Sequence, residues 1–129
     1  MKCINFCLFP AYSILYNHCK PSLSMLATSV AKKQGLDPRL VRSIVSVESS
    51  WRSSSVSSKN AIGLMQVHYP TWKHLWTREQ LKEPETNLIA GTKILKMYMR
   101  ESSTLIEALN KYSGGAKDYH KKVMRRMKG

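Results

Sequence analysis

The stretch DPRLVRSIVSVES (residues 37–49) combines a clear helix start with an unusual carboxylate near its end. Asp37 can cap a helix, and Pro38 suits the first helical position because no backbone hydrogen bond is lost there. Apolar residues then recur at the three- and four-residue spacing of one helix face: Leu40, Val41, Ile44 and Val45. Glu48 lies four residues after Ile44, so it projects from the same inward stripe. Because an unpaired buried carboxylate is unfavourable, we expect Glu48 to have either a partner or a chemical role.

The composition is that of one globular domain with an anionic partner. Of the 129 residues, 43% are apolar and 22% are charged, so the chain can bury one core and disorder is not expected. Lysine and arginine number 21 against 8 aspartates and glutamates, which gives a formal net charge of +13. Nucleic acid, an anionic membrane surface and an anionic cell-wall polymer would each suit this charge, and the charge alone does not choose among them.

The first 21 residues differ from the rest of the chain. They hold all three cysteines, Cys3, Cys7 and Cys19. Neither a zinc-site spacing nor a CxxC pair occurs, so we expect no metal and no cofactor. Residues 3–16 are fairly apolar and follow a lysine, as in a signal peptide, although a proline interrupts the run and no clear cleavage site follows. We interpret residues 1–21 as a possible signal or leader segment. No run approaches the ~20 apolar residues that a membrane span needs.

Beyond this segment the sequence is typical of an all-α protein. Helices are expected over residues 22–34, 37–49, 70–76, 85–100 and 104–113, with a last amphipathic helix over 119–127. Gly35 and Gly114 supply left-handed helix ends. Gly91 lies inside the helix over 85–100, where close packing against a neighbour is the expected reason for it. Residues 50–60 form a serine-rich loop, and no segment alternates as a strand does.

Five short motifs follow one another along the chain: ES at 48–49, SSKNAIGLMQ at 57–66, NLIAG at 87–91, ALNKYSGG at 108–115 and YHKKV at 119–123. In this order and approximate spacing they resemble the soluble lytic transglycosylase family. Its members have a lysozyme-like, all-α and compact catalytic domain with a substrate cleft, and they cleave peptidoglycan. The resemblance covers about residues 25–127. It implies that residues 22–129 are the catalytic domain of a small, specialised member.

The resemblance implies a reaction that needs only one carboxylate. Glycoside hydrolases ordinarily use two carboxylates about 5–10 Å apart, whereas residues 38–78 contain only Glu48. In the resembled family one glutamate protonates the oxygen of the β-1,4 bond from N-acetylmuramic acid to N-acetylglucosamine. Its carboxylate then takes the proton of the 6-hydroxyl as that oxygen closes on C1, while the 2-acetamido oxygen meets the positive charge. The product is a 1,6-anhydro sugar.

The environment of Glu48 decides whether it can act as the acid. Burial against apolar side chains would raise its pKa, so that the carboxyl keeps its proton near neutral pH. The structural alternative is a solvated glutamate at a helix end, or one paired with Arg42 or Arg52.

The resemblance also implies contacts with the sugar chain. The corresponding positions here are Ser49, Ser57, Gly63, Met65, Gln66, Tyr112 and Tyr119. Tyr119 would reach the glutamate or else pack in the core, and Ser49 would orient the glutamate or else bond to its own helix backbone. Gly63 would let the backbone approach the substrate or only form a turn, and Met65 would be cleft wall or plain core.

The chain departs from the family pattern in three places. Asn60 stands where the family usually has glycine and tolerates the same turn. Ser113 replaces an asparagine, which removes an amide. The short interval between Gly115 and Tyr119, where larger members insert a loop, predicts an open-ended cleft. Three tryptophans can either stack on sugars or pack in the core, and both interpretations stay open: Trp51, Trp72 and Trp76.

Small members of the family open peptidoglycan locally for a secretion or conjugation machine or for a phage particle. We therefore expect a monomeric, exported protein of the periplasm or cell envelope, or a virion-associated one. No nucleic-acid partner is expected, because no helix-turn-helix pattern stands out. The alternatives are a goose-type lysozyme, which uses water as the nucleophile, and a non-catalytic basic binding module. The basic tail would follow an anionic polymer or be a solvated helix face.

Overall fold

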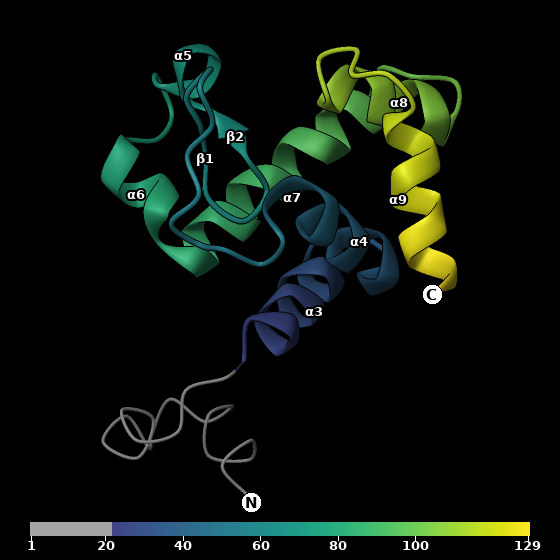
Figure 1. Cartoon of the computed structure of the whole chain (residues 1–129), viewed down its shortest axis with the longest axis horizontal. Coiled ribbons are helices and arrows are strands. Elements are labelled where there is room, and N and C mark those ends of the chain that lie inside the picture. Colours follow the sequence, from purple (N-terminus) through teal and green to yellow (C-terminus); the bar gives the residue numbers. More distant parts are fainter. Residues whose placement is uncertain (1–21) are drawn as a thin grey trace, which may run out of the picture.

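A computed structural model describes residues 22–129, which form helices around two adjoining cores and one small hairpin (Figure 1). In chain order the elements are α3 (Leu23–Lys33), α4 (Pro38–Ser49), β1 (Ala61–Ile62), β2 (Val67–His68), α5 (Tyr69–Trp72), α6 (Arg78–Lys82), α7 (Pro84–Arg100), α8 (Leu105–Tyr112) and α9 (Tyr119–Lys128). The predicted all-α class is confirmed. None of the described helices is long and apolar enough to cross a membrane. The predicted leader segment and its cysteines lie outside the described residues.

The first two helices begin where the sequence predicts. The Ser22 hydroxyl accepts a hydrogen bond from the Met25 N–H at 3.1 Å and caps α3. Asp37 caps α4, and its carboxylate accepts from the Arg39 N–H at 2.8 Å. Gly35 follows α3 with a φ of +73°, as the predicted left-handed helix end requires.

The end of α4 is less ordinary. Ser50 and Trp51 have φ angles of +51° and +66°, two successive left-handed residues without a glycine. Such residues are unfavourable by about 1–3 kcal/mol each unless the surroundings hold them. Trp51 packs against the main core, and the Ser50 N–H donates to the Ser46 carbonyl at 3.1 Å. The chain therefore turns away at Ser50, two residues after Glu48, which leaves this carboxyl in the last turn of α4.

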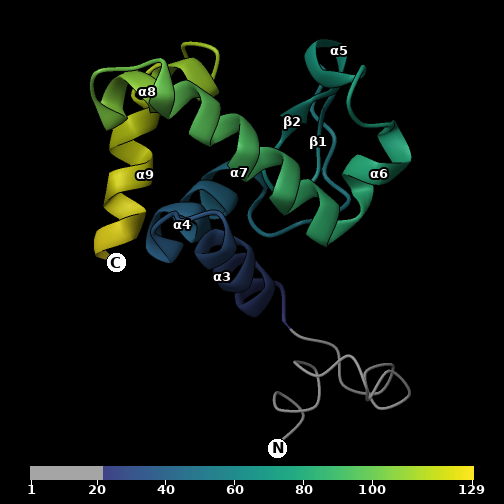
Figure 2. The ribbon, with the colours of Figure 1, turned by 180° about the vertical axis from the view of Figure 1, so that it is seen from behind.

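Helix α7 is the central element and contributes to both cores. The main core lies among α3, α4, α7, α8 and α9, and its fully buried members include Val41, Ile44, Leu88, Leu95, Leu109 and Val123. The second core lies beneath the hairpin and consists of Ile62, Val67, Leu81, Ala90 and Ile94. Seen from behind, α7 runs across the molecule from α6 and the hairpin to α8 (Figure 2). One helix thus sets the distance between the hairpin and α8.

The expectation that no segment forms a strand is wrong for two short segments. β1 and β2 pair antiparallel, with Ala61 opposite His68 and Ile62 opposite Val67. Two-residue strands are too short to show an alternating pattern, so tertiary contacts determine them. The helix expected over residues 70–76 is also shorter, since α5 ends at Trp72. The additional short helix α6 begins with a capping box that the sequence analysis does not identify.

Two residues of α7 hold the hairpin turn against the helix. The fully buried Asn87 side chain accepts from the Met65 N–H at 2.8 Å. Its amide nitrogen donates to the carbonyls of Ile62 and Leu81, both at 2.7 Å. One turn further on, a Cβ at Gly91 would lie 2.6 Å from the Met65 Cβ, closer than real side chains approach. The close packing predicted for Gly91 is confirmed.

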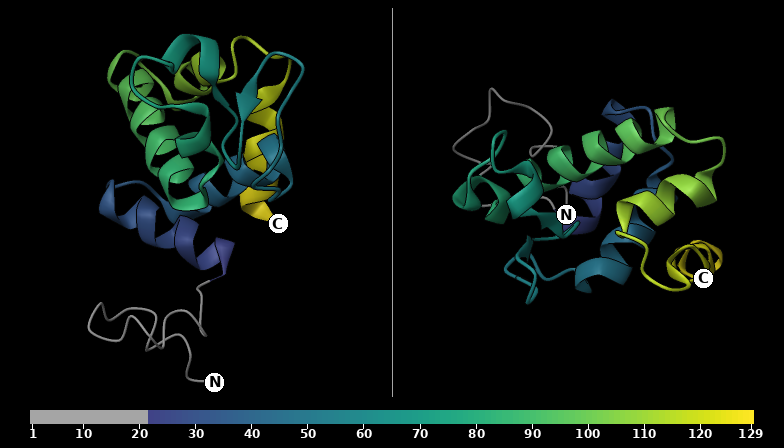
Figure 3. Two further views of the ribbon diagram at one scale, coloured as in Figure 1. Left: turned by 90° about the vertical axis from the view of Figure 1, so that its left-hand side faces the viewer. Right: turned by 90° about the horizontal axis from the view of Figure 1, so that it is seen from above.

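The last two helices complete the main core. The Thr104 hydroxyl caps α8 and accepts from the Glu107 N–H at 3.1 Å. The Glu107 carboxylate accepts from the Ser103 N–H, one residue before the cap. Helix α9 packs along α4 with Tyr119 and Val123 buried, and it is seen nearly end-on in the right-hand view of Figure 3.

Candidate active site

Glu48 lines a cleft of about 330 Å³ between the hairpin side of the molecule and the end of α8. The cleft is formed by the end of α4, the serine-rich loop, the hairpin, α5, α7, the end of α8 and the residues that follow it. Its polar and aromatic lining consists of Glu48, Ser57, Lys59, Gln66, His68, Thr71, Trp72, Tyr98, Lys111, Tyr112 and Ser113. Glu48 is the one carboxylate among these described lining residues. Chemistry that needs a carboxyl group therefore has a single candidate in this cleft.

Burial raises the pKa of Glu48 from 4.5 to about 7. The nearby Tyr119 hydroxyl acts in the opposite direction and lowers the pKa of Glu48. Within residues 22–129 this buried hydroxyl has no hydrogen-bond partner at ordinary geometry. Burial also raises the pKa of Tyr112 and Tyr119, and the charge of Glu48 adds to the effect. Both phenols therefore stay neutral, and Glu48 can exist as acid or as carboxylate near neutral pH.

Neither arginine considered as a partner neutralises Glu48. Arg42 donates instead to the Thr28 hydroxyl on α3 at 2.8 Å. Arg52 is exposed and forms no ion pair in the described part of the chain, and the same holds for Glu48. Because a cation would favour the charged form, the lack of an ion pair leaves the rise in the pKa of Glu48 that burial causes unopposed by any described cation.

Gln66 and Ser57 line the cleft from the hairpin side. Gln66 has a φ of +51°, and its amide nitrogen donates to the carbonyls of Ser55 at 3.2 Å and Gly63 at 3.0 Å. The Ser57 hydroxyl accepts from the Ala61 N–H at 3.0 Å. These bonds join the serine-rich loop to the hairpin, so both side chains are held in place before any ligand binds.

Tyr112 lines the cleft from the α8 side. Its hydroxyl donates to the Met65 carbonyl at 2.8 Å and joins the end of α8 to the hairpin turn. Ser113, which replaces the asparagine of the family pattern, accepts from the Ala116 N–H at 3.1 Å and donates to the Asn110 carbonyl at 3.1 Å. Its hydroxyl thus stabilises the turn toward α9.

Four candidate residues do not line the cleft. One is Tyr119, whose hydroxyl is buried, and the other three are Ser49, Gly63 and Met65. Ser49 is buried and donates to the Val45 carbonyl at 3.1 Å, which is the backbone bond given as its alternative. Gly63 has a φ of +80°, and a Cβ there would lie 2.7 Å from the Leu81 carbonyl oxygen. Met65 is fully buried in the main core. In each case the placement favours the structural alternative, and direct contact with substrate stays a prediction.

The cleft also holds residues that the sequence analysis does not single out: Lys59, His68, Thr71, Ile94, Tyr98 and Lys111. His68 follows Gln66 by two residues, and Lys111 directly precedes Tyr112. Tyr98 lies four residues after Ile94, on the same side of α7. For Lys59, His68 and Lys111, their place inside a motif or within two residues of one was the signal in the sequence. Within residues 22–129 no group of His, Cys, Asp or Glu could hold a metal ion.

The three tryptophans have different surroundings. Trp72 lines the cleft and also packs against the second core. Trp51 packs against the main core and Trp76 against the second core, and neither lines the cleft. Of the two interpretations left open, stacking on sugar in this cleft is thus available to Trp72.

Residues 25–129 match the family described as Transglycosylase SLT domain. The chain belongs to the transglycosylase SLT domain family. The match includes every candidate site residue and confirms the resemblance inferred from the five motifs. It also agrees with the lysozyme-like all-α fold.

Curated relatives of this SLT domain are similar over part of its length. The endo-type membrane-bound lytic murein transglycosylase A of Enterobacter sp. (strain 638) is 34% identical over 82 residues, 56% of this chain and 40% of the relative. The protein of the same name from Cronobacter sakazakii (strain ATCC BAA-894) is 37% identical over 73 residues, 49% of this chain and 36% of the relative. That of Salmonella paratyphi B is 36% identical over 73 residues, with the same coverage. The chain thus spans 36–40% of the length of these relatives.

Proposed function

We propose that this SLT domain is a peptidoglycan lytic transglycosylase in which Glu48 is the catalytic residue, first as acid and then as base. The observation that carries the proposal is the single carboxyl of the described cleft lining. It is mostly buried, forms no ion pair in the described part of the chain and has a pKa of about 7. A hydrolase of the ordinary kind needs a second carboxylate within about 5–10 Å, and none lines the described cleft. A reaction in which one group transfers both protons suits this arrangement.

The steps are those that the family resemblance implies, and their protons balance. Protonated Glu48 donates to the glycosidic oxygen as the bond from C1 of N-acetylmuramic acid breaks, and N-acetylglucosamine leaves with that proton on its oxygen. The 2-acetamido oxygen of the substrate meets the charge at C1. The Glu48 carboxylate then takes the proton of the 6-hydroxyl, and the oxygen–C1 bond closes the 1,6-anhydro ring. Tyr119 supports the carboxylate form between the two transfers, because its hydroxyl can donate to it.

The cleft suits a polymer with both sugar faces and anionic groups. Trp72 offers a ring for stacking, and Gln66 and Ser57 offer polar groups from a preformed wall. Lys59 and Lys111 add positive charge along the lining. We infer that the acetylated sugars and their carboxylate substituents are held by these residues, with no metal or cofactor.

Mass spectrometry of the products from purified peptidoglycan tests the reaction. The expected product ends in 1,6-anhydro-N-acetylmuramic acid and is one water lighter than the hydrolytic product. Reducing N-acetylmuramic acid ends without the anhydro form would assign the SLT domain to the goose-type, hydrolytic alternative. Glu48→Gln should abolish release of muropeptides while wall binding persists. Undiminished digestion by Glu48→Gln would overturn the role of this residue, and the absence of digestion by the parent would favour the non-catalytic binding module.

We further propose that cleavage occurs within glycan strands, in the cell envelope. The relatives are named endo-type and membrane-bound, and the short connection from Gly115 to Tyr119 leaves the end of the cleft without a long loop. A small enzyme of this kind would act as a monomer and open the wall locally for a secretion or conjugation machine or a phage particle. Early products of many lengths from long strands are expected, whereas release of disaccharide units alone would show cleavage from the ends.

A further inference from the structure

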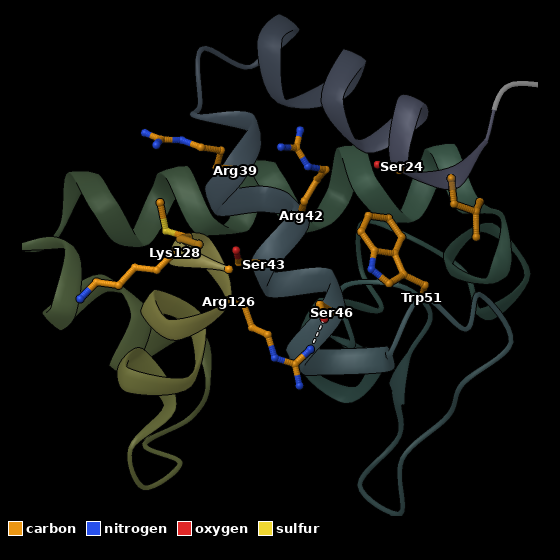
Figure 4. A pocket seen from close by; sticks show the side chains of 11 residues that line it. Ser24, Arg39, Arg42, Ser43, Ser46, Trp51, Arg126 and Lys128 are labelled. Atoms are coloured by element: carbon orange, nitrogen blue, oxygen red, sulfur yellow. Dashed lines mark hydrogen bonds between the residues drawn. The ribbon is translucent and has the colours of Figure 1, made fainter.

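A second pocket, of about 790 Å³, lies on the opposite side of α4 from Glu48, between α3, α4 and α9 (Figure 4). Its lining residues from α4 are Arg39, Arg42, Ser43 and Ser46. Because successive helical residues are about 100° apart, each of these positions lies roughly 120° or more around the helix axis from Glu48. No residue lines both the pocket and the cleft. The pocket is therefore a separate site.

The lining of the pocket is strongly basic. It contains four cationic side chains and no acidic one, the four being Arg39, Arg42, Arg126 and Lys128. They come from two helices distant in sequence, α4 and α9, which pack against each other. Like charges gathered in a concave surface raise the local positive potential and attract an anion.

Two of these arginines lack a carboxylate partner. Arg42 is partly buried and donates to a threonine hydroxyl on α3 at 2.8 Å, and Arg126 donates to the Ser46 hydroxyl. Within residues 22–129 neither arginine forms an ion pair. Arg39 differs, because it pairs with Asp37 at 2.9 Å and is largely exposed. The charges of Arg42 and Arg126 are thus positioned by neutral hydroxyls and available to a ligand.

The pocket is polar at one end and aromatic at the other. In Figure 4, Arg39 and Lys128 lie at one end, Arg42 and Arg126 lie near the middle, and the Trp51 ring lies at the other end. Trp51 is held there by the left-handed turn that ends α4. A fitting ligand therefore has a carboxylate or phosphate for the guanidinium groups and an apolar or sugar-ring body for the indole.

We propose that this pocket, the α3–α4–α9 pocket, binds the carboxylates of the peptides that peptidoglycan carries on its sugars. The choice of ligand rests on the proposed function, whereas the pocket itself does not. A bounded concavity with an aromatic end suits a discrete carboxylate on a bulky body better than an extended surface of phosphates, which a membrane or nucleic acid would present. The SLT domain would then hold one part of the polymer behind α4 while the cleft in front of α4 cleaves another.

Calorimetric titration with N-acetylmuramyl-L-alanyl-D-isoglutamine, which has one free carboxylate, tests the proposal. The parent should bind this dipeptide and should bind its carboxamide derivative much more weakly. Arg126→Gln should raise the Kd about tenfold or more, because a charge-assisted hydrogen bond is lost. Lys122→Gln removes the same charge from the same helix outside the pocket and should leave the Kd unchanged. Arg42→Gln gives a second test from α4, with thermal unfolding as the check on folding.

The location of binding has its own readout. In a Trp72→Phe/Trp76→Phe variant the tryptophan emission of residues 22–129 comes from Trp51, and it should change on addition of the dipeptide but not of the carboxamide. Equal binding of dipeptide and carboxamide, or equal losses in Arg126→Gln and Lys122→Gln, would overturn the proposal. Binding of inorganic phosphate or anionic vesicles without the dipeptide would overturn the choice of ligand. Glu48→Gln should leave the Kd of the dipeptide unchanged. If no 1,6-anhydro product is found but the dipeptide still binds, the result counts against the proposed function and not against the pocket.

Discussion

At the scale of single residues, Glu48 occupies a position where an apolar side chain would be more favourable for stability. Its carboxyl ends the inward stripe of α4 and has no cation within the described residues. Burial disfavours the charged form of this carboxyl and thereby raises its pKa to about 7. Retaining such a group is consistent with chemistry that needs a neutral acid at the cleft.

Replacing Glu48 by Gln should change how stability depends on pH. The pKa is raised from 4.5 to about 7 on folding, so the folded state holds the proton more tightly than the unfolded state. The contribution to stability is fully present below pH 4.5 and is lost as the pH rises through 7. Between these limits the parent should lose roughly 3 kcal/mol of unfolding free energy relative to Glu48→Gln. Urea unfolding at acid and alkaline pH measures this; an identical offset at both would contradict the raised pKa.

Tyr119→Phe should raise the pKa of Glu48 further, because the hydroxyl that favours the carboxylate is removed. The alkaline limb of kcat/KM should move to higher pH, since the acid form would persist longer. The rate constant kcat should fall about tenfold, because the carboxylate formed between the two proton transfers loses a nearby hydroxyl that can donate to it. Phenylalanine keeps the packing of the ring, so thermal stability should change little. An unshifted pH profile would show that Tyr119 has only a packing role.

At the scale of elements, α7 helps to shape the cleft by holding the hairpin. Its two motif residues that do so, Asn87 and Gly91, have no acid–base function. Asn87 bonds three backbone groups of the hairpin region and of the end of α6. Gly91 lets the Met65 backbone and side chain approach the helix. The turn between β1 and β2 is thereby fixed, and Gln66 is presented to the cleft.

Asn87→Ala should lower the free energy of unfolding by about 3 kcal/mol or more, because a buried N–H and two buried carbonyls lose their partner. Activity should fall as well, since Gln66 is no longer held by a fixed turn. Denaturant unfolding and digestion of purified peptidoglycan give the two readouts. Asn110→Ala, at an exposed position of α8, is the matched control and should stay within about 0.5 kcal/mol of the parent.

At the scale of the whole molecule, the net charge of +13 accompanies two sites on opposite sides of α4. The exposed charges of α9 extend the positive surface beside the α3–α4–α9 pocket. Long-range attraction to an anionic wall is the expected result, and it acts over about 10 Å at 0.1 M salt.

Binding to purified cell-wall polymer should therefore weaken as salt is raised from about 0.05 M to about 0.5 M. Sedimentation with insoluble peptidoglycan measures the bound fraction, using Glu48→Gln to prevent digestion. Peptidoglycan with amidated carboxylates is the control and should show weaker binding and a shallower salt dependence. Binding that is equally strong at both salt concentrations would mean that contacts other than charge dominate.

Much of this protein is determined by local sequence. Ser22, Asp37 and Thr104 cap their helices through bonds that reach only two or three residues ahead, and Gly35 ends a helix through its own φ freedom. Such features depend on neighbours in the chain, which is why the α3, α4, α7, α8 and α9 helices and the family could be predicted from the sequence.

Other features depend on residues distant in the chain, and only the tertiary structure decided them. Asn87 holds the hairpin through bonds to Met65 and Ile62, which lie 22 and 25 residues earlier in the sequence. The Tyr112 hydroxyl donates to the Met65 carbonyl, 47 residues earlier. The α3–α4–α9 pocket joins Arg42 to Arg126, which no spacing along the chain reveals. The burial that raises the pKa of Glu48 to about 7 also depends on the tertiary structure. Other parts of the folded chain surround this carboxyl and keep water from it, so that it retains its proton to a higher pH than an exposed glutamate does.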